Sequence, residues 1–287
     1  MKVENKSKLY SEMIEENSNG GKVSGTPLGD RGKQIPNLFT LLNLFFGCMA
    51  IVFALQTESV IIYVNEEFSS SFNIPEKLTW AAIFIGIAAV IDFLDGFIAR
   101  LFNATSALGK QLDSLSDIVS FGVAPGVILY QLLRFSFARE ENGLEVSVVW
   151  LLPAFIVSCA AAWRLGKFNL DTKQEFNFRG LPTPVAGLVV ASLPLILHYN
   201  PELFNAGNIL INKWVLYLII FLLSFLMISK FPMMGMKFNN FSVKNNLPKI
   251  ILLAIAIISA IFLQWLAVPV IFVVYILLSL AFKKTLT

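Results

Sequence analysis

Long apolar runs alternate with short polar connections along most of the chain. Most runs have about the 20 residues that a helix needs to cross the hydrocarbon core of a bilayer. Backbone polar groups in lipid need internal partners, so such runs are expected to be α-helical. The pattern predicts an all-α, polytopic transmembrane helical bundle of about eight spans. The expected spans are residues 37–56, 79–99, 111–134, 147–166, 182–199, 213–230, 249–265 and 267–283.

The two ends of the chain differ from this regular pattern. Residues 1–34 are polar, mixed in charge and rich in Gly, Ser and Asn, which is typical of a flexible tail. They also lack the apolar core of a cleavable signal peptide. The last two apolar segments share one run that is divided near Gln264 and Pro269 and is short for two spans. We therefore expect a tail (1–34), a membrane domain (35–231) and a C-terminal transmembrane helix pair (249–283), whose count of one or two spans stays open.

Composition and charge agree with a membrane protein. Apolar residues make up 56% of the chain and charged residues 14%, against roughly 25% charged residues in soluble domains. With eight spans, 18 of the 22 lysines and arginines fall on one side of the membrane. The positive-inside rule places that side, and with it both termini, in the cytoplasm. Membrane lipids are the expected surroundings, and no nucleic-acid partner is expected.

This topology brings polar residues from distant segments to one cytoplasmic level of the membrane, as a binding or catalytic site requires. These residues are Asn37, Thr40 and Asn43 in the first span, Asp92 and Asp95 in the second, Asp113 and Asp117 in the third, Arg164, Lys167 and Asn169 at the end of the fourth, and Arg179 before the fifth.

Four aspartates on two consecutive spans form the most informative group. Asp92 and Asp95 are spaced i, i+3, and Asp113 and Asp117 are spaced i, i+4, so each pair lies on one helix face. Four acids at membrane depth are costly, and a divalent cation offsets their repulsion. Oxygen ligands suit Mg²⁺, Mn²⁺ or Ca²⁺ better than zinc, and four carboxylates suffice for two ions.

Three neighbouring residues allow two interpretations each. Gly96 and Gly109 would let a base or a diphosphate approach the backbone closely, or would serve helix packing. Arg100 would bind phosphate, or would extend to the lipid headgroups.

Together these residues resemble the signature of the CDP-alcohol phosphatidyltransferase family, which has two Asp, Gly, Ala-Arg, Gly and two further Asp. The matching positions are Asp92, Asp95, Gly96, Ala99, Arg100, Gly109, Asp113 and Asp117.

The resemblance covers roughly residues 36–230 and implies a six-helix core with a site at the cytoplasmic face of a bacterial inner membrane. It implies Mg²⁺ or Mn²⁺, as two ions, on Asp92, Asp95, Asp113 and Asp117. Asp117 would also be the general base. The donor would be CDP-diacylglycerol, bound near Gly96, Ala99, Arg100, Gly109, Asn37 and Thr40. A homodimer is also implied.

Flanking segments are similar to the bacterial and archaeal branch of the family whose acceptor is L-serine. They are IPNLFTLLNLFFG (35–47), SFGVAPG (120–126), RLGKFN (164–169) and FRGLPTP (178–184). The resemblance thus implies phosphatidyl transfer to serine in phospholipid biosynthesis. Glycerol phosphate or inositol phosphate as acceptor stays open, and a cation channel or transporter is the alternative outside enzymes.

Serine carries a carboxylate, which needs a cation near lipid, and an arginine binds a carboxylate with two parallel hydrogen bonds. Arg164 is the first candidate, with Lys167, Asn169 and Arg179 as further acceptor-binding residues. Each cation alone would equally suit contact with lipid headgroups.

Overall fold

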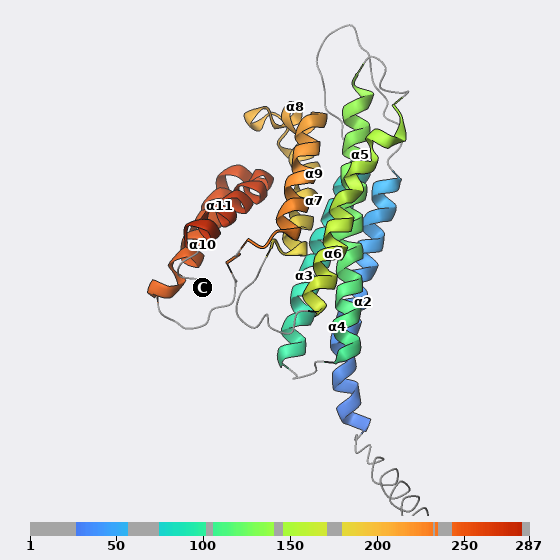
Figure 1. Cartoon of the computed structure of the whole chain (residues 1–287), viewed down its shortest axis with the longest axis vertical. Coiled ribbons are helices and arrows are strands. Elements are labelled where there is room, and N and C mark those ends of the chain that lie inside the picture. The colour runs from blue at the N-terminus through green and yellow to red at the C-terminus, as the bar shows by residue number, and fades with distance from the viewer. Residues whose placement is uncertain are drawn as a thin grey trace, which may run out of the picture.

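The computed structural model describes residues 27–56, 75–101, 106–140, 146–170, 180–231, 233–234 and 243–282. Within these ranges the chain is almost wholly helical and contains no β-strand. Figure 1 shows a long helical bundle, with the last two helices, α10 and α11, at its side. The predicted all-α fold is therefore confirmed.

The first two helices of the bundle pack against each other along much of their length. They are α2 (Pro27–Leu55) and α3 (Glu76–Leu101). Phe84 of α3 packs against Phe46 and Phe53 of α2, with ring centroids 6.0 and 5.0 Å away. The helix α2 begins at Pro27, inside the 1–34 segment expected to be a tail.

The third segment is one continuous helical run from Ala107 to Ala138. It consists of α4 (Ala107–Ile118), the π-helical turn η1 (Val119–Val123) and α5 (Ala124–Ala138). At the π turn, the Ser120 hydroxyl donates to the backbone oxygen of Asn43, 3.0 Å away. A Cβ at Gly47 would lie 2.9 Å from the Ser120 Cα, so the absence of a side chain at Gly47 allows α2 to cross this turn closely.

The remaining core helices are less regular than the apolar pattern predicted. The fourth segment starts as two 3₁₀ turns, η3 (Val148–Trp150) and η4 (Leu152–Phe155), before α6 (Ile156–Leu170). The central helix α7 (Thr183–Tyr199) is followed by η5 (Leu203–Asn205), α8 (Ala206–Leu210) and α9 (Lys213–Ile228). The segment Leu203–Leu210 is bent by 89° from α9. Positive φ angles at Phe204 and Asn205 lie within this irregular connection.

The C-terminal helices are α10 (Val243–Leu263) and α11 (Ala267–Ala281), joined by the 3₁₀ turn η6 (Gln264–Leu266). The chain reverses at η6, because Leu252 of α10 and Tyr275 of α11 line the same cavity. Gln264 has a positive φ of 48°, and its side chain accepts a hydrogen bond from Asn200 at 2.9 Å. The break thus lies at Gln264, as predicted, whereas Pro269 lies within α11.

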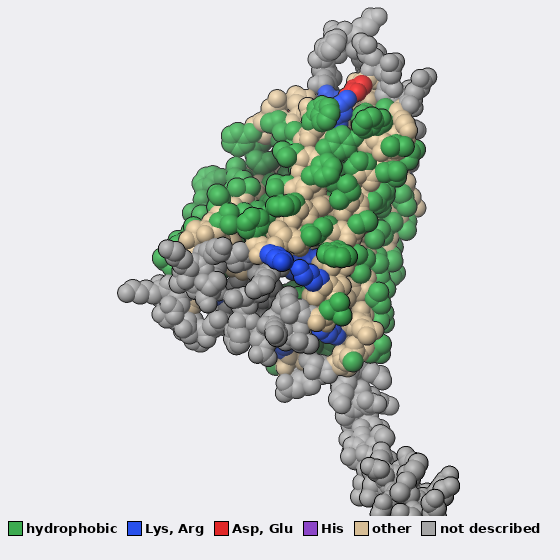
Figure 2. Space-filling model, in the orientation of Figure 1, with side chains coloured by type: hydrophobic (Ala, Val, Ile, Leu, Met, Phe, Trp, Pro, Cys, Tyr) green, Lys and Arg blue, Asp and Glu red, His purple; other side chains and the backbone are tan. Residues whose placement is uncertain are grey.

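Five of the described helical stretches are long and apolar enough to cross a membrane, or six if the bent α8–α9 pair counts as one span. The helix α7 has only 17 residues, and the whole α10–α11 run counts as a single stretch. The total of eight spans therefore stays a prediction. In Figure 2 hydrophobic side chains cover most of the visible face, while Lys and Arg side chains show at its top, beside an acidic side chain, and again in its lower half.

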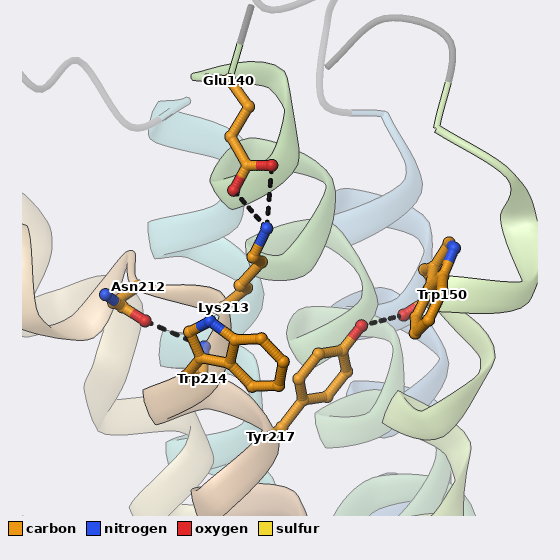
Figure 3. A network of polar contacts seen from close by, with 6 residues as sticks. All are labelled: Glu140, Trp150, Asn212, Lys213, Trp214 and Tyr217. Carbon is orange, nitrogen blue, oxygen red and sulfur yellow. Dashed lines mark hydrogen bonds and ion pairs between the residues drawn. The ribbon is translucent and has the colours of Figure 1, made fainter. Parts of the chain in front are cut away.

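A polar network joins three elements at the end of the bundle opposite to the start of α4 (Figure 3). Lys213 lies 2.8 Å from Glu140, and the Tyr217 hydroxyl donates to the backbone oxygen of Trp150 at 2.6 Å. The side chain of Asn212 caps α9 by accepting from the Trp214 amide. These contacts join α9 to η3 and to the residues that follow α5.

Candidate metal centre and substrate site

Three aspartates meet where the C-terminal half of α3 lies beside α4. One carboxylate oxygen from each of Asp92, Asp95 and Asp113 lies within 4.8 Å of the other two. Asp95 is buried, and the other two are half-buried. The i, i+3 spacing on α3 places its two acids on one face, and α4 brings Asp113 to that face.

The donor set of this cluster fits a hard divalent cation. All three ligand groups are carboxylates, with neither His nor Cys in the cluster. Oxygen ligands of this kind suit Mg²⁺ or Mn²⁺ rather than zinc. Carboxylates so close together at membrane depth repel one another, and a bound cation would offset that repulsion.

The helix α2 supports the cluster from one side. The Thr40 hydroxyl lies 2.9 Å from Oδ2 of Asp95, to which it donates a hydrogen bond. Thr40 itself is buried. Asn37, one turn earlier, packs against the start of α4, because a Cβ at Gly109 would lie 2.9 Å from the Asn37 Oδ1. Asn37 and Thr40, the two α2 residues predicted to bind the donor, therefore lie next to α4 and α3.

The two signature glycines have different surroundings. At Gly96 an added Cβ would meet only an Arg100 nitrogen, 4.0 Å away, so this side of α3 is open. Asn37 and Ser106 lie so close to Gly109 that a side chain there would clash, so close packing of α2 against α4 explains the glycine. Arg100 is exposed and its Nε donates to the Gly96 oxygen at 2.8 Å, while Ala99 is half-buried.

Asp117 is surrounded differently from the other three aspartates. It is buried beside Asp92, and the two carboxyl groups are close enough to interact directly. The side-chain amide of Asn43 lies 3.4 Å from Oδ1 of Asp117 and 3.3 Å from the Ser116 hydroxyl, and donates toward both. Asn43 is fully buried; the sequence analysis placed it at the level of the site but assigned it no binding or catalytic role. Its spacing of three residues from Thr40 and four from Gly47 places all three on one face of α2, which is the signal that could have predicted its contact with Asp117.

Arg164 extends from α6 toward the acidic group. A guanidinium nitrogen donates to the Thr183 hydroxyl at 3.0 Å, whereas its buried Nε has no hydrogen-bond partner among the described residues. Arg164 also lies near the Asp117 carboxyl and the Tyr275 hydroxyl. Thr183, which the sequence analysis did not single out, orients this arginine from the first residue of α7.

The other predicted acceptor-binding residues lie farther along α6 or outside the described residues. The side-chain amide of Asn169 donates to the Ser114 hydroxyl at 2.8 Å, which links α6 to the residue after Asp113. Lys167 is exposed on α6. Arg179 lies outside the described residues.

A family model described as CDP-alcohol phosphatidyltransferase matches residues 33–240. The chain belongs to the CDP-alcohol phosphatidyltransferase family. The match includes all eight signature residues and the helices from α3 to α9, and it ends before α10. The resemblance drawn from the signature is thereby confirmed.

Relatives within the CDP-alcohol phosphatidyltransferases include a CDP-diacylglycerol–serine O-phosphatidyltransferase of Helicobacter pylori strain 26695. It is 32% identical over 232 residues, which are 80% of this chain and 81% of the relative. The enzyme of the same name from Bacillus subtilis strain 168 is 34% identical over 128 residues, 45% of this chain and 66% of the relative. An archaetidylserine synthase of Methanothermobacter thermautotrophicus is 32% identical over 168 residues, 58% of this chain and 60% of the relative.

Proposed function

We propose that this chain transfers the phosphatidyl group of CDP-diacylglycerol to the hydroxyl group of L-serine, giving phosphatidylserine and CMP in phospholipid biosynthesis. The observation that carries this proposal is the cluster of Asp92, Asp95 and Asp113 with Asp117 beside it, which lies within the segment that the family model matches. The names of the relatives support serine as the acceptor.

The acidic cluster is proposed to hold two divalent cations, Mg²⁺ or Mn²⁺. Asp92, Asp95 and Asp113 supply the converging oxygens, and Asp117 would complete the ligand set. Bound cations would neutralise the donor's diphosphate and stabilise the charge on departing CMP. Thr40 holds the Asp95 carboxylate in place by its 2.9 Å hydrogen bond.

Asp117 is proposed to act as the general base. As the serine oxygen attacks the lipid-side phosphorus, Asp117 accepts the hydroxyl proton, and the bond from that phosphorus to the CMP oxygen breaks. Serine's hydroxyl is a weak nucleophile at neutral pH, so a positioned base contributes substantially to the rate. Asn43 fixes one carboxylate oxygen of Asp117 through its amide. This direct transfer needs no covalent enzyme intermediate.

The donor is proposed to lie along the open side of α3. Gly96 presents no side chain there, and the CDP group would pass Ala99 and Arg100 toward the aspartates. Asn37, which packs against Gly109 at the start of α4, and Thr40, which holds Asp95, would contact the donor from α2. Phosphoryl-transfer enzymes act mainly by positioning the reacting groups and stabilising their charge, so holding the diphosphate in place is a large part of catalysis.

Arg164 is proposed to bind the serine carboxylate. Its guanidinium lies near Asp117 and keeps a buried Nε without a partner among the described residues, which would suit a carboxylate oxygen. Lys167, Asn169 and Arg179 would complete the acceptor site. The proposed site then faces the cytoplasm, where free serine is available, in an inner-membrane protein with both termini inside. A homodimer is supported by the family resemblance alone.

The decisive assay is CMP release from CDP-diacylglycerol by the purified protein with serine, glycerol phosphate or inositol phosphate as acceptor. Release that depends on serine and is at least tenfold faster than with either phosphorylated acceptor supports the proposal. Faster release with a phosphorylated acceptor would keep the reaction class and overturn serine. No release with any acceptor would overturn the enzyme assignment.

A further inference from the structure

An apolar cavity of about 380 Å³ lies between α7 and the C-terminal helices. Val185 and Val189 of α7 form one wall, and Leu252 of α10 with Val268 and Phe272 of α11 form the other. This volume falls within the range of about 300–1,000 Å³ that is typical of ligand pockets. The cavity is lined by residues on both sides of the family match's C-terminal limit at residue 240.

The lining chemistry restricts what can occupy the cavity. Tyr275 supplies the one side-chain hydroxyl among the lining residues, and that hydroxyl already donates to the Met234 oxygen at 3.1 Å. Water needs two to four polar partners to be stable in a cavity, and an ion or a headgroup needs more. A hydrocarbon chain is the occupant that this lining accommodates.

One end of the cavity lies beside the proposed reaction site. Thr183, which holds Arg164, stands between the lining residues Pro182 and Val185. Arg164 in turn lies near both Asp117 and the lining residue Tyr275. A lipid with its phosphate at the acidic cluster therefore has the cavity within reach of its tails.

We propose that this cavity receives one acyl chain of the phosphatidyl donor, with α10–α11 as its outer wall. This inference rests on the proposed function for the identity of the lipid. It gives the C-terminal helix pair a substrate-binding role, in addition to the site formed by α3, α4 and α6. A chain held there would fix the donor's depth and lateral position, so that its phosphorus stays in line with the acceptor.

A matched pair of variants tests this role. Leu252→Trp would fill the cavity, whereas Leu253→Trp places the same side chain at a neighbouring position that is 59% exposed on the outer face of α10. With CDP-dioleoylglycerol, L252W should lower kcat/KM at least tenfold and L253W less than twofold. With CDP-dihexanoylglycerol, whose chains are short, both should stay within twofold of wild type. An equal loss of L252W activity with both donors, or no loss with either, would overturn the proposal.

A direct measurement uses the wild-type protein and so does not depend on a variant that folds. A CDP-diacylglycerol probe with a photoreactive diazirine near the end of each acyl chain is crosslinked, and the labelled peptides are identified by mass spectrometry. Labelling within α7, α10 or α11 that excess CDP-dioleoylglycerol suppresses, and excess phosphatidylcholine does not, supports the proposal. Labelling confined to other helices, or equal suppression by both lipids, would overturn it. If wild type released no CMP with serine, the proposed function would fail, while this crosslink would still decide where the CDP-lipid's chain lies.

Discussion

At the scale of single residues, the four aspartates differ in what holds them. Asp95 is fixed by Thr40, and Asp117 by Asn43. Asp113 follows the turn that Ser106 caps at the start of α4. The converging carboxylates are those of Asp92, Asp95 and Asp113, whereas Asp117 is buried beside Asp92 and next to the amide of Asn43. This difference in surroundings supports the additional role of general base proposed for Asp117.

The variant Asp113→Asn is expected to lower turnover at least about 100-fold at ordinary metal levels. Losing a residue that only hydrogen-bonds a metal ligand already costs about 10–100-fold in metal affinity or activity, and Asp113 is proposed to bind the metal directly. A neutral amide is a weaker ligand than a carboxylate, so high Mn²⁺ should restore part of the activity. The measurement is CMP release against metal concentration, with membrane insertion checked by expression and gel filtration. Near-normal activity of the purified variant would remove Asp113 from the metal site.

The variant Asp117→Asn is expected to lower kcat by about 10²–10⁴-fold, the usual contribution of a general base. Affinity for the CDP-lipid should change less than threefold, because the three converging carboxylates remain. Donor binding measured by displacement of a fluorescent CDP-lipid separates the two effects. A large loss of donor affinity with an unchanged chemical step would make Asp117 chiefly a metal ligand.

The variant Arg164→Lys keeps the positive charge but loses the planar guanidinium group, which can donate two parallel hydrogen bonds to a carboxylate. A hydrogen bond to a charged group is worth about 1.5–3 kcal/mol, so the serine KM should rise about tenfold or more. The KM for CDP-diacylglycerol should stay within twofold. Steady-state kinetics with each substrate varied in turn provide the check, and an equal rise in both values would contradict a role in serine binding.

At the scale of elements, backbone hydrogen bonds connect the residues just before α7 to the end of α9. The Gly180 amide donates to the Phe231 oxygen at 2.9 Å, and the Leu181 amide to the Leu226 oxygen at 3.0 Å. Gly180 has a φ of 78°, and a Cβ there would lie 2.7 Å from the Met227 oxygen. This connection positions Thr183, and through it Arg164.

The variant Gly180→Ala is therefore expected to destabilise the protein, since a strained backbone position costs about 1–3 kcal/mol even before the steric clash. A thermal shift in detergent should show a Tm lower by several degrees, together with a raised serine KM. Gly86→Ala in α3 is the matched control, because no atom lies within 4 Å of its added Cβ. An unchanged Tm for G180A would show that this connection carries little strain.

At the scale of the whole molecule, the sequence predicts those features that helical periodicity determines. Helical spacing put Asp92 and Asp95 on one face of their helix, with Asp113 on the next helix. The predicted topology put Arg164 at the same depth in the membrane as these aspartates. The Arg164–Thr183 contact could not be predicted, because the path between the two residues depends on tertiary packing. Gly109 was ambiguous for the same reason, since Asn37 of another helix decides its role.

The apolar pattern was also uninformative about the C-terminal helices. From Ile250 onward α10 and α11 are almost wholly apolar, and lipid tails are as apolar as leucine, so hydropathy alone does not identify the face that meets α7. The bend before α9 was missed because Phe204 and Asn205, its positive-φ residues, are not glycines. The cavity between α7 and the C-terminal pair became visible only in three dimensions.

The central claim is that the aspartate cluster performs metal-dependent phosphatidyl transfer to serine. The most direct test strips the purified protein of metal with a chelator and supplies CDP-diacylglycerol, isotope-labelled serine and increasing Mg²⁺ or Mn²⁺. The proposal predicts no labelled lipid without metal and, with metal, one labelled phosphatidylserine for each CMP released. Labelled phosphatidylserine formed in metal-free protein, or CMP released without serine entering lipid, would contradict it.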